Sequence, residues 1–152
     1  GGGIAMNLGV HSLDIVQFLT DARIKSVRAR IGIYALNAEV EGNAQVLAVL
    51  DNGLTACITL SGYKNVPQNE TELLFTGGSL MLNGSSLRVG MDGKYEDVEL
   101  QQIEPFAQQL SELIKSIESN TVPPISGDFG KSIVKAVKAI YESSERDIEV
   151  ML

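Results

Sequence analysis

The fold is decided by residues 43–61, which read NAQVLAVL, DNG and LTACITLS in succession. Apolar and small side chains recur at every second position in both outer segments, as they do in half-buried β-strands. The central DNG supplies residues that tolerate the positive φ angles of a tight turn. The stretch therefore predicts an antiparallel hairpin with one inward set of side chains: Ala44, Val46, Ala48 and Leu50, then Leu54, Ala56, Ile58 and Leu60.

Other strands are predicted on both sides of this hairpin. The turn TGG at 76–78 separates strands at 70–75 and 79–83, and DGK at 92–94 separates strands at 87–91 and 95–100. In a strand predicted at 24–34, the alternation of apolar and polar residues shifts by one position near the middle, which predicts a bulge. A last strand is predicted at 148–152. Because short turns join antiparallel neighbours, the sheet is predicted to be mostly antiparallel.

Three helices accompany the strands. Residues 5–19 are apolar nearly all round, which predicts a buried or sandwiched helix. A second helix begins at Pro105, and a third is predicted to be capped by Asp128. This order indicates an α+β fold, one open, mostly antiparallel sheet with helices packed on one face. The second helix carries a stripe that is predicted to be buried: Phe106, Leu110, Leu113, Ile114 and Ile117.

Composition restricts the setting and the partners. The chain has 152 residues, about one domain, and its net charge of −7 argues against a nucleic-acid partner. Its apolar runs are shorter than the roughly 20 residues of a membrane helix, so no membrane partner is expected. Cys57 is the single cysteine, which excludes an internal disulfide and favours a reduced, cytoplasmic setting. We interpret it as a small core residue, and the basic residues of the first strand as a solvated face.

The second face of the sheet also carries apolar residues, among them Leu47 and Val49. An antiparallel sheet covered on one side exposes its other side, and such a face requires cover by another chain. We therefore expect a homodimer or homotetramer formed through the open sheet face.

One polar group stands out on the first helix. Asn7, His11 and Asp14 fall at positions i, i+4 and i+7, so all three project from one side. His11 is the only histidine, and an imidazole exchanges protons near neutral pH. Spacing alone leaves two interpretations, an acid/base group or a hydrogen-bonded core histidine.

Residues 1–14, GGGIAMNLGVHSLD, resemble the G-G-G-x-x-x-D/N-x-G-x-H-x-x-D segment of the Gfo/Idh/MocA oxidoreductases. The DNG turn, the segment TGGSL at 76–80, the helix and tail at 106–123 and the segment YESS at 141–144 are similar to family features in the same order. The resemblance thus covers nearly the whole chain.

The resemblance implies an NAD(P)-dependent dehydrogenase of a sugar, sugar nucleotide or polyol. Residues 1–152 are then a single C-terminal substrate-binding and oligomerisation domain, like that of dihydrodipicolinate reductase. NAD or NADP is bound mainly by an N-terminal Rossmann half, absent from this chain, which also supplies a lysine beside the substrate. The opening glycines, without a methionine, are expected from a cut through a longer polypeptide or from an engineered start. The chain alone is expected to be inactive.

The resemblance also assigns roles to residues. His11 matches the family histidine that helps remove or return the substrate's hydroxyl proton, and Asn7 stands where many members have aspartate. An amide is not a base, so Asn7 is expected to position a hydroxyl. Asp14 is expected to orient the helix and border the substrate.

Three further expectations concern the loops and the substrate. Lys64, in a polar loop, is expected either to meet a substrate phosphate or carboxylate or to be solvated. The glycines at 1–3 lack the G-x-G-x-x-G spacing of a phosphate cradle and are interpreted as close backbone packing. Residues 4–11 look like the branch that oxidises the 3-hydroxyl of UDP-N-acetylglucosaminuronate.

The alternative function is an assembly module that has lost catalysis.

Overall fold

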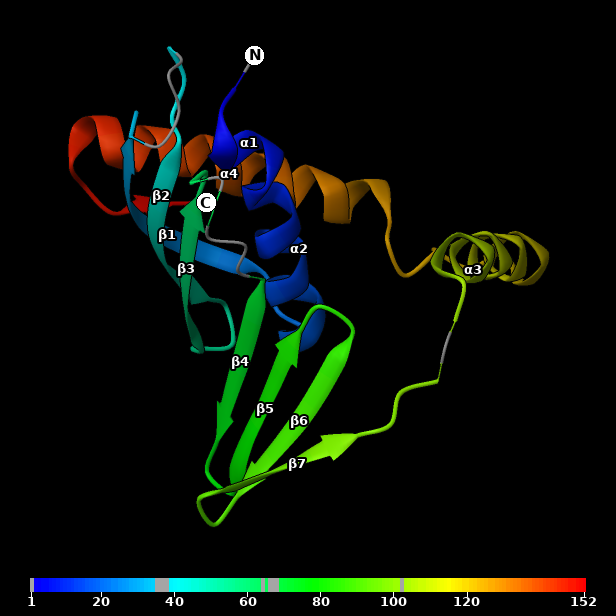
Figure 1. Ribbon diagram of the computed structural model, residues 1–152. Coiled ribbons are helices and arrows are strands. Elements are labelled where there is room, and N and C mark those ends of the chain that lie inside the picture. The colour runs from blue at the N-terminus through cyan, green and yellow to red at the C-terminus, as the bar shows by residue number, and fades with distance from the viewer. Residues whose placement is uncertain (1, 35–38, 64, 66–68, 102) are drawn as a thin grey trace. The chain divides into compact units, whose positions relative to one another are not determined.

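A computed structural model describes residues 2–34, 39–63, 65, 69–101 and 103–152 (Figure 1). The chain divides into two compact units, one of Gly1–Asn65 with Pro124–Leu152, the other of Val66–Pro123. Lys64, the predicted loop contact to substrate, lies outside the described residues.

The first unit contains a four-stranded antiparallel sheet in the order β3-β2-β1-β8. The DNG hairpin is confirmed, because Val46 pairs with Ile58 and Gly53 takes a φ of 87° in the turn. The bulge lies at the start of β1, as a register shift between Ile24 and Ser26, and not near the middle of the strand as predicted. The bounds of the strands are Ile24–Gly32 for β1, Asn43–Leu50 for β2, Thr55–Ser61 for β3 and Val150–Met151 for β8.

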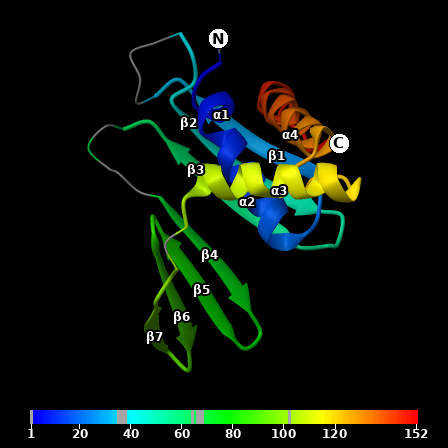
Figure 2. The same cartoon turned by 90° about the vertical axis from the view of Figure 1, so that its right-hand side faces the viewer.

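Three helices cover one face of this sheet (Figures 1 and 2). They are α1 (Ile4–Asn7), α2 (Gly9–Thr20) and α4 (Gly127–Arg146). Inward residues of the sheet form one buried cluster with Leu13 of α2 and Val137 of α4, both of which are 0% exposed. The predicted α+β class with helices on one sheet face is therefore confirmed for this unit. Among the described residues, no helix is long and apolar enough to cross a membrane.

The outward face of the sheet corrects the prediction for Cys57. This thiol is exposed on β3, opposite Leu47 of β2, whereas Ile58 and Leu60 on either side of Thr59 point inward. The period of two along a strand places Cys57 on the face away from the helices, so it is not a core residue. Arg28 and Arg30 lie on the same outward face as predicted, and both pair with the exposed carboxylate of Asp147.

The second unit contains its own four-stranded antiparallel sheet, in the order β4-β5-β6-β7. The strands thus form two sheets where the sequence predicts one, although both predicted hairpins are present. A pattern of alternating residues and turns defines each strand pair, but it does not say which hairpins join edge to edge. The bounds are Glu70–Phe75 for β4, Gly78–Asn83 for β5, Ser86–Met91 for β6 and Lys94–Val98 for β7.

Helix α3 (Pro105–Ser119) begins where its sequence predicts, with the Glu104 carboxylate accepting from the Ala107 N–H at 2.7 Å. Its apolar stripe, however, is exposed rather than buried: Phe106 is 79% and Ile117 69% exposed. Helical periodicity shows which face of a helix is apolar, but not whether the same chain covers it.

The cap of α4 is a further correction. Ser126, not Asp128, is the N-cap, and its hydroxyl accepts from the Phe129 N–H at 3.2 Å. Asp128 lies in the first turn of the helix, where a carboxylate interacts favourably with the positive end of the helix dipole.

Candidate functional site

The predicted first helix is built as two helices that join at Leu8. This residue has φ −98° and ψ −30°, and it separates the last residue of α1 from the first residue of α2. The Leu8 N–H donates to the Ile4 carbonyl at 2.8 Å, and the Leu8 carbonyl accepts from the His11 N–H at 3.1 Å. Asn7 is thus the last residue of α1, and His11 lies in the first turn of α2.

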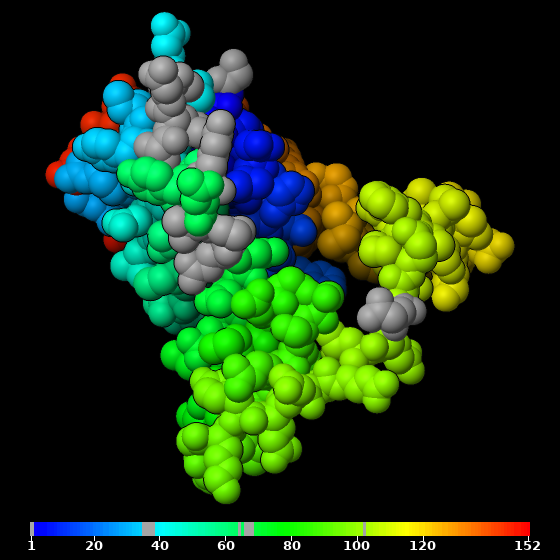
Figure 3. Space-filling view, in the orientation of Figure 1, coloured from blue at the N-terminus to red at the C-terminus, as the bar shows by residue number. Residues whose placement is uncertain are grey.

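The side chains of this predicted site face away from the core. Asn7 and His11 are exposed and Asp14 is half-buried, while Leu13 on the same helix is buried. Helices α1 and α2 lie at the surface in the space-filling view, in dark blue (Figure 3). His11 is thus not part of the buried cluster of this unit. Between described residues, no hydrogen bond or ion pair occupies these three polar side chains.

Asn7 borders an open hollow of about 550 Å³ in the first unit. Backbone of Gly2, Gly3 and Gly62 contributes to its wall, and Asn7 is its only polar side chain among the described lining residues. His11 and Asp14, which lie on α2, do not line it. Asn7 is the only predicted site residue that the structure places at the hollow, and Lys64 is outside the described residues.

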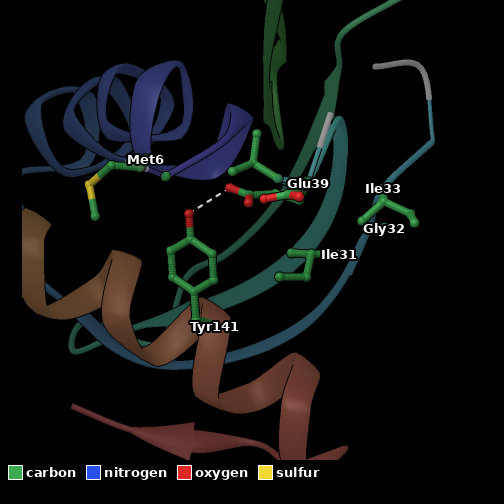
Figure 4. Close-up of a pocket in the computed structure, with 9 residues that line it drawn as sticks. Met6, Ile31, Gly32, Ile33, Glu39 and Tyr141 are labelled. Carbon is green, nitrogen blue, oxygen red and sulfur yellow. Dashed lines mark hydrogen bonds between the residues drawn. The ribbon is translucent and has the colours of Figure 1, made fainter. Parts of the chain in front are cut away.

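Sequence reasoning missed Glu41, a buried carboxylate that holds the start of α1. Glu41 is only 7% exposed, and its Oε1 accepts from the Tyr141 hydroxyl at 2.5 Å and from the Ala5 N–H at 3.2 Å. Its carbonyl accepts from the Ile4 N–H at 3.0 Å. The first of these bonds is drawn in Figure 4, where Tyr141 points from α4 toward α1. One residue thus ties α1 to α4.

This contact changes the chemistry of Tyr141. Burial, followed by the hydrogen bond to Glu41 and the repulsion from its negative charge, raises the pKa of Tyr141 from 10.0 to about 12. The phenol is therefore a hydrogen-bond donor at neutral pH. It lines a second hollow of about 470 Å³ with Met6, Ile31 and Glu39 (Figure 4).

Gly3 permits this arrangement because it lacks a side chain. A Cβ at Gly3 would stand 2.2 Å from the Glu41 carbonyl oxygen and 2.6 Å from its carboxylate carbon, closer than real Cβ atoms approach. The interpretation of the opening glycines as close backbone packing is confirmed at this position.

A family model described as the GFO/IDH/MocA C-terminal domain matches residues 1–81, more than half of the 152-residue chain. The matched region contains α1, α2, the first sheet's three long strands and Glu41. The chain belongs to the Gfo/Idh/MocA family of oxidoreductases.

Two dehydrogenases resemble this family member in sequence. A 1-carboxy-3-chloro-3,4-dihydroxycyclo hexa-1,5-diene dehydrogenase of Comamonas testosteroni is 33% identical over 70 residues, covering 46% of this chain and 18% of that protein. A D-xylose 1-dehydrogenase [NADP(+)] of Haloarcula marismortui is 20% identical over 160 residues, covering 100% of this chain and 44% of that protein. The chain thus spans less than half the length of these relatives.

The fold is shared with solved structures of the family. The aldose-aldose oxidoreductase of Caulobacter crescentus, solved with glycerol, superposes with a TM-score of 0.88 at 23% identity. The superposition covers 99% of this chain and 48% of that one. The α+β fold of the Gfo/Idh/MocA C-terminal domain is therefore shown for this chain.

The YESS segment at 141–144, which resembles the family motif, accepts hydrogen bonds from backbone amides at the edge of β1. β8 pairs with β1 only at Ser26 and Val27, so the amides beyond lack a strand partner. The Ser143 Oγ accepts from the Ala29 N–H at 2.9 Å, and the Ser144 Oγ accepts from the Ile31 N–H at 3.0 Å. Beyond the end of β8, the two serine hydroxyls thus take the place of a strand partner for these amides of β1.

Neither hollow offers a metal site. Within the described part of the chain, no three histidine, cysteine, aspartate or glutamate residues cluster closely enough to hold a metal ion.

Proposed function

We propose that this chain is the substrate-binding and catalytic-helix domain of an NAD(P)-dependent dehydrogenase, which oxidises a hydroxyl group of a sugar, sugar nucleotide or polyol. The observation that carries the proposal is the exposure of Asn7 on α1 and His11 on α2, with Asn7 at the border of a hollow. Membership of an oxidoreductase family and the two dehydrogenase relatives support it.

The lining of the hollow supports a division of labour between two halves of a longer protein. Its described side chains are apolar apart from Asn7, so the polar groups that the described lining offers are one amide and the backbone. Such a lining fits a ring and its hydroxyl groups. The phosphates of NAD(P) are then bound by an N-terminal Rossmann half, and when bound there the cofactor supplies the hydride acceptor.

The residues of this chain handle the substrate's hydroxyl. Oxidation of an alcohol to a carbonyl removes a hydride from carbon and a proton from oxygen. Neutral His11 accepts that proton through a ring nitrogen, or returns it in the reverse direction. Asn7 positions the hydroxyl by hydrogen bonding, because its amide does not act as a base. The family's lysine from the N-terminal half is the second candidate for the proton.

Asp14 and Lys64 have supporting roles in this proposal. The half-buried Asp14 carboxylate stands one turn beyond His11, where it orients the helix and borders the substrate. Lys64 meets a phosphate or carboxylate of the substrate from its loop. We place the protein in the cytoplasm, where Cys57 stays reduced.

The second candidate function is a non-catalytic assembly module. It rests on the outward face of the first sheet, where Leu47 is 48% exposed beside the Cys57 thiol, a feature that is equally compatible with the enzyme. A second copy covering this face gives a homodimer or homotetramer in either case. The two functions differ in turnover and not in assembly.

Turnover by the full-length protein tests the proposal. NADH or NADPH formation is followed with a panel of UDP-sugars, UDP-uronates including UDP-N-acetylglucosaminuronate, inositols and simple hexoses. We expect turnover with one class. No turnover with any of them under either cofactor favours the assembly module.

The isolated chain supplies a second test. Residues 1–152 alone are expected neither to bind NADH tightly nor to turn over, since the Rossmann half is missing. A tight, saturable NADH titration of this chain contradicts that division of labour.

A further inference from the structure

We propose that Glu41 and Tyr141 are positioning residues, which together anchor α1 on the sheet and thereby set the place of Asn7 and His11. The catalytic consequence rests on the proposed function, whereas the anchoring itself concerns this chain alone.

The first argument is the convergence of contacts on Glu41. The backbone carbonyl of Glu41 accepts from Ile4, and its carboxylate accepts from Ala5, so two N–H groups of the first turn of α1 end on one residue. These N–H groups have no partner inside the helix. The same carboxylate oxygen accepts from the hydroxyl of Tyr141, which lies 100 positions along the chain, on α4 (Figure 4).

The second argument is burial. Glu41 is 7% exposed and packs beneath Gly3, where a Cβ would collide with it. A buried carboxylate is stable only when hydrogen bonds replace its lost water. The described donors to its carboxylate are the Ala5 N–H and the Tyr141 hydroxyl. Removal of either donor therefore weakens the anchor directly.

A displacement of α1 also changes the positions of Asn7 and His11. α1 has only four residues, far too short to hold its place without tertiary contacts. Asn7 is its last residue, and the Asn7 N–H donates to the Gly3 carbonyl at 3.0 Å. The His11 N–H is bonded to the Leu8 carbonyl, so a displacement of α1 moves Asn7 directly and His11 through Leu8.

Hydrogen exchange of the isolated chain tests the anchoring. In Tyr141→Phe, which keeps the ring and removes the hydroxyl, we expect the amides of Ala5, Asn7 and Leu8 to exchange about tenfold faster or more. Tyr95→Phe is the matched control, because Tyr95 is 42% exposed on β7, in the other unit. Unchanged exchange of these three amides in Tyr141→Phe overturns the proposal whatever the activity shows.

Kinetics of the full-length enzyme test the catalytic consequence. Misplaced reacting groups lower the rate of the chemical step more than they weaken binding. In Tyr141→Phe we expect kcat to fall about tenfold to hundredfold while KM stays within about threefold. Glu41→Ala should do the same, and Glu41→Gln, which keeps an accepting oxygen, should restore most of kcat. Glu142→Gln, a neighbour that pairs with exposed Arg146, is the matched control with unchanged kcat.

The outcomes separate this proposal from the proposed function. Faster exchange with unchanged kcat in folded Tyr141→Phe overturns the positioning role, as does a Glu41→Gln variant no better than Glu41→Ala. Absence of turnover in the wild type overturns the proposed function and the catalytic role of the pair with it, while exchange still decides the anchoring.

Discussion

The two compact units carry the same local signals but differ in what covers their sheets. Both contain antiparallel hairpins with tight turns, and both contain an amphipathic helix. In the first unit α4 lies against β1, and Val137 and Ile140 are almost completely buried. In the second, Leu74 on β4 is 78% exposed and Phe106 on α3 is 79% exposed.

Every buried apolar side chain among the described residues belongs to the first unit. Sequence periodicity therefore predicts where helices and strands form, whereas burial in a shared core stabilises them. The candidate site lies on the unit that has this core, which suits a site that must hold its geometry.

The largest expected effect compares two helical leucines. Leu13 of α2 is 0% exposed, and Leu110 of α3 is 57% exposed. Leu13→Ala removes buried contacts and leaves a cavity, so the free energy of unfolding should fall by about 3–5 kcal/mol. Leu110→Ala should change it by less than about 1 kcal/mol. Urea unfolding of both variants measures the difference, and equal losses would show that α3 is covered in solution.

The next effect compares two helical serines. The Ser143 Oγ accepts from the buried Ala29 N–H and donates to the Ile148 carbonyl at 2.5 Å, whereas the Ser119 Oγ donates to the Lys115 carbonyl on an exposed helix. Ser143→Ala leaves buried groups unpaired and should cost about 2–3 kcal/mol of unfolding free energy. Ser119→Ala should cost less than about 0.5 kcal/mol. A small loss for Ser143→Ala would show that water replaces its hydroxyl.

Alkaline pH should weaken the first unit through Tyr141. Its pKa is raised from 10.0 to about 12 in the folded chain, so between these pH values the unfolded chain has lost a proton that the folded chain keeps. This contribution to stability is complete below about pH 10 and is lost as the pH rises to about 12, a fall of about 1–2 kcal/mol.

The pH effect is measured as a difference between the wild type and a variant. Tyr141→Phe should unfold with a shallower dependence on pH than the wild type. Parallel slopes for the wild type and Tyr141→Phe would contradict a raised pKa.

The smallest expected effect compares a turn in each unit, and the loss of stability should be similar in the two. Gly53 and Gly93 take φ angles of 87° and 74°, and neither has an atom within 4 Å of where a Cβ would stand. Alanine at either position costs backbone strain alone, about 1 kcal/mol. Hydrogen exchange of the flanking strands measures each loss. A much larger effect in one turn would show that the units also differ locally.

Much of the fold could be predicted from local pattern. Alternation and the DNG turn fix the β2–β3 hairpin to within one residue, because turn geometry and side-chain period act over a few positions. The division into two sheets and the exposed stripe of α3 could not be predicted, since both depend on which surfaces meet. The inward prediction for Cys57 conflicted with the period that places Ile58 inward.

Of the site, the helical region that carries Asn7, His11 and Asp14 could be predicted from the sequence, but its division into α1 and α2 at Leu8 could not. The roles of these three residues stay a prediction. Glu41 could not be found this way, as a glutamate in a polar segment is usually exposed. Its burial depends on Tyr141, which is distant in sequence, and the clues were the close-packed Gly3 and the YESS segment.

The most direct test of the central claim is the rate of hydride transfer by full-length His11→Ala, measured at saturating substrate and cofactor. The account predicts that kcat falls about 10²–10⁴-fold, while cofactor affinity and the unfolding midpoint stay near those of the wild type. A His11→Ala enzyme with wild-type kcat would contradict the claim that α1 and α2 carry the chemistry of this domain.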